Sequence, residues 1–85
     1  MPVPIHQSVS VAVIFENGSI KPQYFLWQQK KIVIDAVSFI WRTKIGMADI
    51  LHFSVIARKT LYELVFDTQG LTWKLEQTEP LTANS

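Results

Sequence analysis

The chain contains no cysteine among its 85 residues. It therefore has no disulfides, no thiolate metal ligands and no cysteine nucleophile. Its three glycines form no glycine-rich loop of the kind that cradles a phosphate group. No stretch approaches the roughly 18 uninterrupted apolar residues that a membrane-spanning helix needs. The first residues also lack the basic segment and cleavage site of a signal peptide, so we expect a cytoplasmic location.

Charge of one sign is not in excess either, because 8 basic and 7 acidic residues give a formal net charge of +1. A chain so close to neutrality lacks the overall field that draws proteins to nucleic acids or anionic membranes. Apolar residues, in contrast, are abundant: they make up 48% of the sequence, which includes three tryptophans. A domain of this size has a thin core. We therefore expect part of the apolar surface to lie in a contact between subunits.

Hydrophobic residues alternate with a period of two and never hold the helical period for three turns, which predicts strands throughout. The expected strands cover residues 8–16, 19–28, 31–44, 49–58, 61–68 and 71–77. Short turns join them, so we predict an all-β domain over residues 8–78. It is a single antiparallel meander of about six strands, strongly twisted or rolled into a partly open barrel. Residues 1–7 form an extended lead-in, and residues 79–85 form a flexible tail.

The longest apolar run, residues 31–43, changes phase between Ile34 and Val37. A bulge or sharp bend near Asp35 would bring both groups of apolar residues to one face of a long central strand. Before it, Asn17 and Gly18 predict a tight hairpin turn. Pro22 in the return strand predicts an irregularity there, since proline cannot donate a ladder hydrogen bond.

The predicted core takes one large side chain from most strands. Its members are Phe25, Val37, Trp41, Phe53, Leu64 and Trp73.

Candidate catalytic and metal-binding residues are few. His6 and His52 are the only histidines, fewer than the three or four ligands of a zinc site, and hydrogen bonding to a neighbour explains them better than metal binding does. Ser54 shares a strand face with His52, as a hydrolase would require, but no nucleophile motif surrounds it. Asp35 and Glu63 are candidate acid and base groups, although carboxylates on strands are mostly solvated or paired with lysine or arginine. We expect no catalytic residue, no metal site and no cofactor.

Basic residues form three small clusters, two at predicted turns and one at the end of the long strand. The clusters are Lys30 with Lys31, Arg42 with Lys44, and Arg58 with Lys59. Together with aromatic side chains such as Trp27, Tyr24 and Trp41 they form a candidate surface for single-stranded nucleic acid or another partner. The alternative is that these lysines protect strand edges and turns against aggregation.

Several strands carry apolar residues on both faces, which predicts self-association, most simply as a dimer. Ile50 and Ile56 are the residues we expect in that contact, because they lie opposite Leu51 and Val55. The alternative is a tight barrel with scattered outer aliphatic residues, which need no partner.

A spaced pattern of aromatic and charged residues extends over about residues 21–76. It consists of Pro22-x-x-Phe25-x-Trp27, Lys30-Lys31, Val37, Trp41-Arg42, Phe53-x-Val55, Leu61-Tyr62-Glu63-Leu64, Asp67 and Trp73-x-Leu75-Glu76. The pattern resembles a family of small uncharacterised bacterial β domains often encoded near Y-family translesion DNA polymerases. That family is richer in arginine, and it often has a glycine where Lys59 and Thr60 stand here. The resemblance implies a genomic neighbourhood and no activity.

These observations favour a non-enzymatic β module that mediates association with itself, with a DNA-repair protein or nucleic acid as a further candidate partner. The alternative is a small-ligand binder or enzyme that uses a cleft between rolled strands.

Overall fold

The computed structural model describes residues 2–81, and this part of the chain contains seven strands and no helix. The strands are β1 (Val3–Glu16), β2 (Ser19–Trp27), β3 (Lys30–Val33), β4 (Ala36–Ile45), β5 (Ala48–Ala57), β6 (Thr60–Asp67) and β7 (Thr72–Pro80). All neighbours pair antiparallel, so the predicted all-β fold is confirmed. Residues 2–81 include no helix that is long and apolar enough to cross a membrane.

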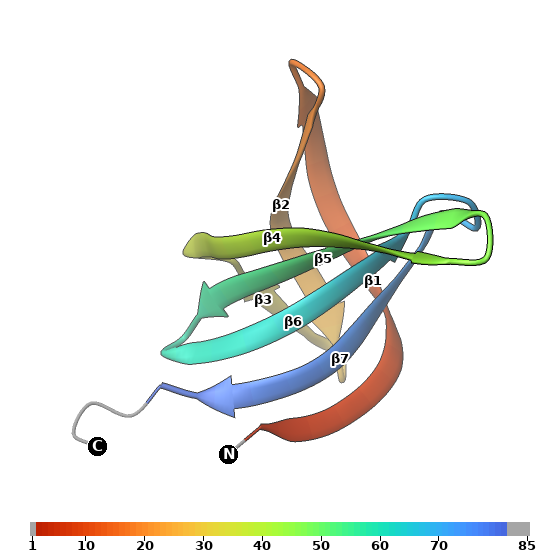
Figure 1. Cartoon of the computed structure of the whole chain (residues 1–85). Helices are drawn as coiled ribbons and strands as arrows, with labels where there is room; N and C mark the ends of the chain where they lie inside the picture. Colours follow the sequence, from red (N-terminus) through yellow and green to blue (C-terminus); the bar gives the residue numbers. More distant parts are fainter. Residues whose placement is uncertain (1, 82–85) are drawn as a thin grey trace.

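The strands form one sheet in the order β3-β2-β1-β7-β6-β5-β4, which is rolled but not closed into a barrel. β1 joins its two halves, since its first part pairs with β7 and its second part with β2. The hairpin formed by β1 and β2 projects away from the rest of the sheet, while β4 crosses in front of β2 (Figure 1). Strands that pass from one half to the other through a bend are the usual way to make such corners.

The long strand predicted over residues 31–43 is divided in two at Ile34 and Asp35. The amide of Ile34 donates to the carbonyl of Gln23 in β2 (3.0 Å), and the amide of Asp35 donates to the carbonyl of Ile56 in β5 (2.8 Å). The bend expected near Asp35 is therefore confirmed. The central position is wrong: β3 pairs only with β2 and β4 pairs only with β5, so these two strands are the edges of the sheet.

The irregularity expected at Pro22 is also present. Ala12 pairs with Tyr24 and Val13 pairs with Pro22, so Gln23 is an extra residue in β2. Proline lacks the N–H that a regular ladder would use at this point.

The ends of the domain extend further than the alternation in the sequence indicates. β1 begins at Val3, inside the predicted lead-in, because Val3 and Pro4 pair with Thr78 and Gln77 of β7. β7 in turn continues to Pro80. Residues 82–85 of the predicted tail lie outside the described residues.

The core lies inside the roll and is built from alternate residues of β2, β3, β5, β6 and β7. Its buried members are Phe25, Ile32, Phe53, Val55, Ala57, Tyr62, Leu64, Phe66 and Leu75. The predictions for Phe25, Phe53 and Leu64 are confirmed, and Trp73 packs half-buried against this cluster.

The predictions for Val37 and Trp41 are wrong. Val37 is 38% exposed, because β4 is an edge strand and its side chains have neighbours on one flank only. Trp41 lies opposite His52 in the ladder and therefore on the outer side of the sheet, away from the core.

Candidate functional site

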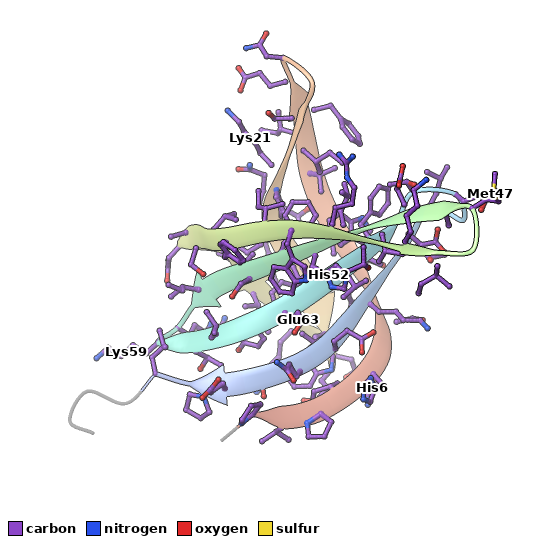
Figure 2. The ribbon with its side chains drawn as sticks, in the orientation of Figure 1. His6, Lys21, Met47, His52, Lys59 and Glu63 are labelled. Atoms are coloured by element: carbon purple, nitrogen blue, oxygen red, sulfur yellow. The ribbon has the colours of Figure 1, made fainter. Side chains whose placement is uncertain are left out.

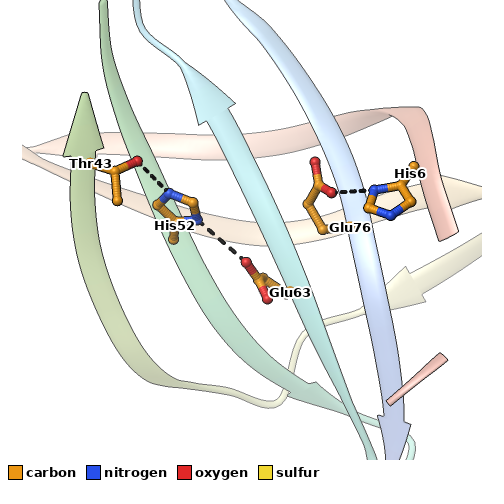
Figure 3. A network of polar contacts seen from close by, with 5 residues as sticks. All are labelled: His6, Thr43, His52, Glu63 and Glu76. Atoms are coloured by element: carbon orange, nitrogen blue, oxygen red, sulfur yellow. Dashed lines mark hydrogen bonds and ion pairs between the residues drawn. The ribbon is translucent and has the colours of Figure 1, made fainter. Parts of the chain in front are cut away.

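A polar network lies on the outer face, which we define as the side of β4, β5 and β6 that faces away from the core. His52 of β5 is its centre. The hydroxyl of Thr43 lies 2.8 Å from His52 Nε2, and Glu63 Oε2 lies 3.3 Å from His52 Nδ1 (Figure 3). The three side chains come from adjacent strands, and Thr43 and Glu63 are both diagonal to His52, because Thr43 is opposite Ile50 and Glu63 is opposite Ser54.

An aromatic row continues this network toward the free edge of the sheet. The ring of Trp41 stacks on His52 with centroids 4.9 Å apart and an interplanar angle of 9°. Phe39 follows at 5.5 Å from Trp41 and is 62% exposed. A shallow hollow of about 290 Å³ lies beside this row, between Phe39, Leu61 and Gln77. The row places a large, exposed apolar surface next to polar groups.

The order of groups in the network, hydroxyl, imidazole and carboxylate, is also the order found in nucleophilic hydrolases. The hydroxyl that reaches His52 belongs to Thr43, whereas Ser54, the residue singled out in the sequence, is hydrogen-bonded to Ser38 through its carbonyl. No buried side-chain nitrogen or oxygen of the described residues lacks a hydrogen-bond partner. The network thus meets a structural need, since its members satisfy one another in a half-buried position.

The other histidine, His6, lies apart from this network. Its Nδ1 contacts Glu76 on the neighbouring strand β7, at 2.5 Å. Among residues 2–81 no group of three or more histidine, aspartate or glutamate side chains is arranged to hold a metal ion. The structure therefore does not bring His6 and His52 together.

The basic residues of two turns, in contrast, lie side by side at one end of the molecule. The guanidinium of Arg58 donates to the carbonyl of Lys31 (3.0 Å), which joins the start of β3, just after the β2–β3 turn, to the β5–β6 turn. Lys30 and Lys59 are exposed next to them. We call these four residues the basic end; Figure 2 marks its position by Lys59.

Aromatic side chains near the basic end are already engaged. Trp27 packs edge-on against Tyr62 and donates its indole N–H to Gln7 (2.9 Å). The ring of Tyr24 is covered by the Lys31 ammonium group, 4.3 Å from the ring centre. Arg42 and Lys44 of the third basic cluster belong to β4 and lie elsewhere.

Backbone strain at the basic end was not visible in the sequence. Arg58 and Lys59 have φ values of 52° and 58°, and Gln28 and Gln29 of the adjoining turn have values of 53° and 62°. This left-handed region favours glycine, as at the Asn17–Gly18 turn, where Gly18 has a φ of 78°. Long polar side chains held there against their preference are a feature of functional positions.

A wedge opens between the projecting hairpin and β4. β2 pairs with β3 only from Tyr24 onward, and β4 pairs only with β5, so the two strands diverge beyond Ile34. Two cavities of about 480 and 230 Å³ lie in the wedge. Their lining is mostly apolar and includes Ile20, Ile34, Val37, Ile40 and Phe53.

The two residues expected in a subunit contact lie on the outer face but differ in exposure. Ile50 is only 5% exposed, and it lines a small cavity together with Ile45 and Val65. Ile56 is half-buried and lies beside Leu61 in the ladder. Ile56 therefore offers surface to a partner, whereas Ile50 offers almost none.

No family model, no curated protein and no solved structure matches this chain.

Proposed function

We propose that this chain is a non-enzymatic, cytoplasmic β module that works by association, in the first place with a second copy of itself. The observation that carries this proposal is the exposed aromatic row on the outer face. Phe39 is 62% exposed beside Trp41, and the half-buried Ile56 and Leu61 lie one and two strands away. Exposed apolar surface of this kind marks interaction sites on small proteins.

A second copy is a suitable partner for this surface. The outer face is a twisted antiparallel sheet, and two such sheets pack face to face at about 10 Å with their apolar side chains between them. A twofold axis through the face would bring each Phe39 near the partner's outer face, and it would leave the polar groups of His52 and Glu63 within reach of the partner's backbone or of water. The net charge of +1 offers little repulsion against this contact.

Lysine substitutions at two similarly exposed phenylalanine residues test the proposal. Phe39→Lys places an ammonium group in the contact, so we expect a folded monomer when its mass is measured by light scattering after gel filtration. Phe15→Lys is the matched control, because Phe15 is 70% exposed on the projecting hairpin, away from the outer face. The control should keep the dimer mass of the unmodified protein. Equal masses for both variants would contradict the proposed contact.

Association with single-stranded nucleic acid, or with a DNA-repair protein, is the second part of the proposal, and the basic end supports it. Four cationic residues belong to this end of the molecule, and two of them occupy strained turn positions. Phosphate contacts of this kind weaken as salt rises, because bound counterions are released. A labelled oligothymidylate should therefore bind in 20 mM salt and be released at about 300 mM. Lys59→Glu should weaken this binding several-fold more than Lys74→Glu on β7.

A small-ligand site in the wedge is the alternative function, and the cavity of about 480 Å³ favours it. Its volume falls within the range of small-molecule pockets. A ligand would be held by Ile20, Ile34 and Ile40 and would be oriented by Asp35. Screening a fragment library by protein NMR tests this function: shifts confined to these residues would support it, and their absence would exclude it.

A further inference from the structure

We infer that the free edge of β4 accepts an extended peptide as an added strand, and that this peptide carries two acidic side chains and an apolar one at alternate positions. This site is distinct from the outer face, where the proposed dimer contact lies. It combines an unpaired strand edge, an apolar wedge and two cations, of which Arg42 has no ion-pair partner among residues 2–81.

The backbone of β4 provides the unpaired edge. Ile45 pairs with Ala48 across the two-residue turn at Gly46 and Met47, which sets the ladder alternation with β5. By this alternation the N–H and C=O groups of Ile40, Arg42 and Lys44 point away from β5. β4 has no other strand partner in residues 2–81. An edge with several free donors and acceptors in a row is matched by another extended backbone, because a compact ligand cannot satisfy that spacing.

The wedge defines what the side chains of the added strand meet. Ile40 and Arg42 line the smaller cavity together with Gly18, Ile20 and Phe53. Ile40 also borders the larger cavity with Ile34 and Val37. An apolar side chain opposite Ile40 would therefore enter a preformed apolar space. Figure 2 labels Lys21 on the projecting hairpin and Met47 in the β4–β5 turn, which lie on the two arms of the wedge.

The positive charges of β4 determine which other side chains the added strand should carry. β4 contains Arg42 and Lys44 and no acidic residue. Lys44 lies 3.7 Å from Asp49 and is 66% exposed, whereas Arg42 has no ion-pair partner within the described part of the chain. Directly opposite positions in an antiparallel pair attract when their charges differ. Acidic residues opposite Lys44 and Arg42, followed by an apolar residue opposite Ile40, give the order acidic-x-acidic-x-apolar.

The same charges argue against a second copy at this edge. Pairing β4 with β4 of another molecule would bring the cations of both strands together without an acidic residue between them. The occupant that fits is therefore a peptide segment of a different, acidic partner.

The test uses the whole protein and a fluorescein-labelled peptide, Thr-Glu-Thr-Glu-Thr-Leu-Thr, in fluorescence anisotropy. We expect saturable binding, at least tenfold weaker binding when both glutamates are replaced by lysine, and a similar loss when the peptide amides are N-methylated. The double variant Arg42→Glu, Lys44→Glu should reverse the preference and bind the lysine peptide more tightly. Lys74→Glu on β7 is the control and should leave the preference unchanged.

Three results would overturn the inference. The first is no binding at 1 mM peptide, and the second is equal binding of the glutamate and lysine peptides. The third is a peptide that dissociates the dimer, which would mean that the edge itself is the self-association surface. Failure of the protein to dimerise would not affect the peptide measurement, so the two proposals can fail separately.

Discussion

At the scale of single residues, two aromatic side chains from adjacent strands lie on opposite faces of the sheet. Phe53 in β5 is 1% exposed within the core, whereas Trp41 in β4 lies on the outer face, stacked on His52. The alternation in each strand is clear in the sequence. Which face of β4 is buried depends on the extra residue between Val37 and Phe39, where the register with β5 shifts. A bulge of this kind has no unambiguous signal in one sequence.

This difference predicts unequal costs of truncation. Phe53→Ala should lower the free energy of unfolding by about 3–5 kcal/mol, because it leaves a cavity among fully buried neighbours. Trp41→Ala should cost less than about 2 kcal/mol, since part of the ring is already in water. Urea denaturation of both variants, followed by circular dichroism, measures the two values. Equal costs would mean that Trp41 belongs to the core after all.

The polar network around His52 gives a second prediction at this scale. Thr43→Val keeps the shape of the side chain but removes the hydroxyl that contacts His52 Nε2 at 2.8 Å. Because the site is half-exposed and water can replace the hydroxyl, the loss should be only about 0.5–1.5 kcal/mol of unfolding free energy. A loss above about 3 kcal/mol in urea denaturation would show that the network is far more buried than its exposure indicates.

At the scale of the elements, turns and bends were partly readable from the sequence. Asn17 and Gly18 predicted a hairpin, because both residue types readily adopt the positive φ that a tight two-residue turn requires. The phase change after Ile34 identified the bend. The Arg58–Lys59 and Gln28–Gln29 turns gave no such conformational signal, because nothing in these residue types favours a left-handed backbone.

The strained turn predicts a conflict between stability and binding. Lys59→Gly should raise the unfolding free energy by about 1 kcal/mol, because glycine adopts the φ of 58° without strain. Gly18→Ala, the matched control at a φ of 78°, should lower it by a similar amount. The same Lys59→Gly variant should bind oligothymidylate more weakly. If Lys59→Gly changed neither the unfolding free energy nor the binding of oligothymidylate, the charge of Lys59 would not explain why lysine occupies this turn.

At the scale of the whole molecule, the meander order of the chain and its rolled, partly open form were predictable, whereas the pairing that joins the two halves of the sheet was not. Each strand pairs with its sequence neighbour except where β3 meets β4, and where β1 closes onto β7. The closure depends on residues far apart in the chain, such as Val3 with Thr78, whose pairing no local pattern specifies. The basic end likewise exists only because the fold joins two distant turns. Sequence alone therefore identified the cations but not their common location.

The central claim, that copies of this module associate, is tested most directly by sedimentation equilibrium of the unmodified chain over a concentration series. The chain has a mass of 9.8 kDa. The account predicts a rise to about twice that mass within the micromolar range, because the aromatic row of the outer face is covered only in the dimer. A mass that stays at 9.8 kDa up to several hundred micromolar would contradict it.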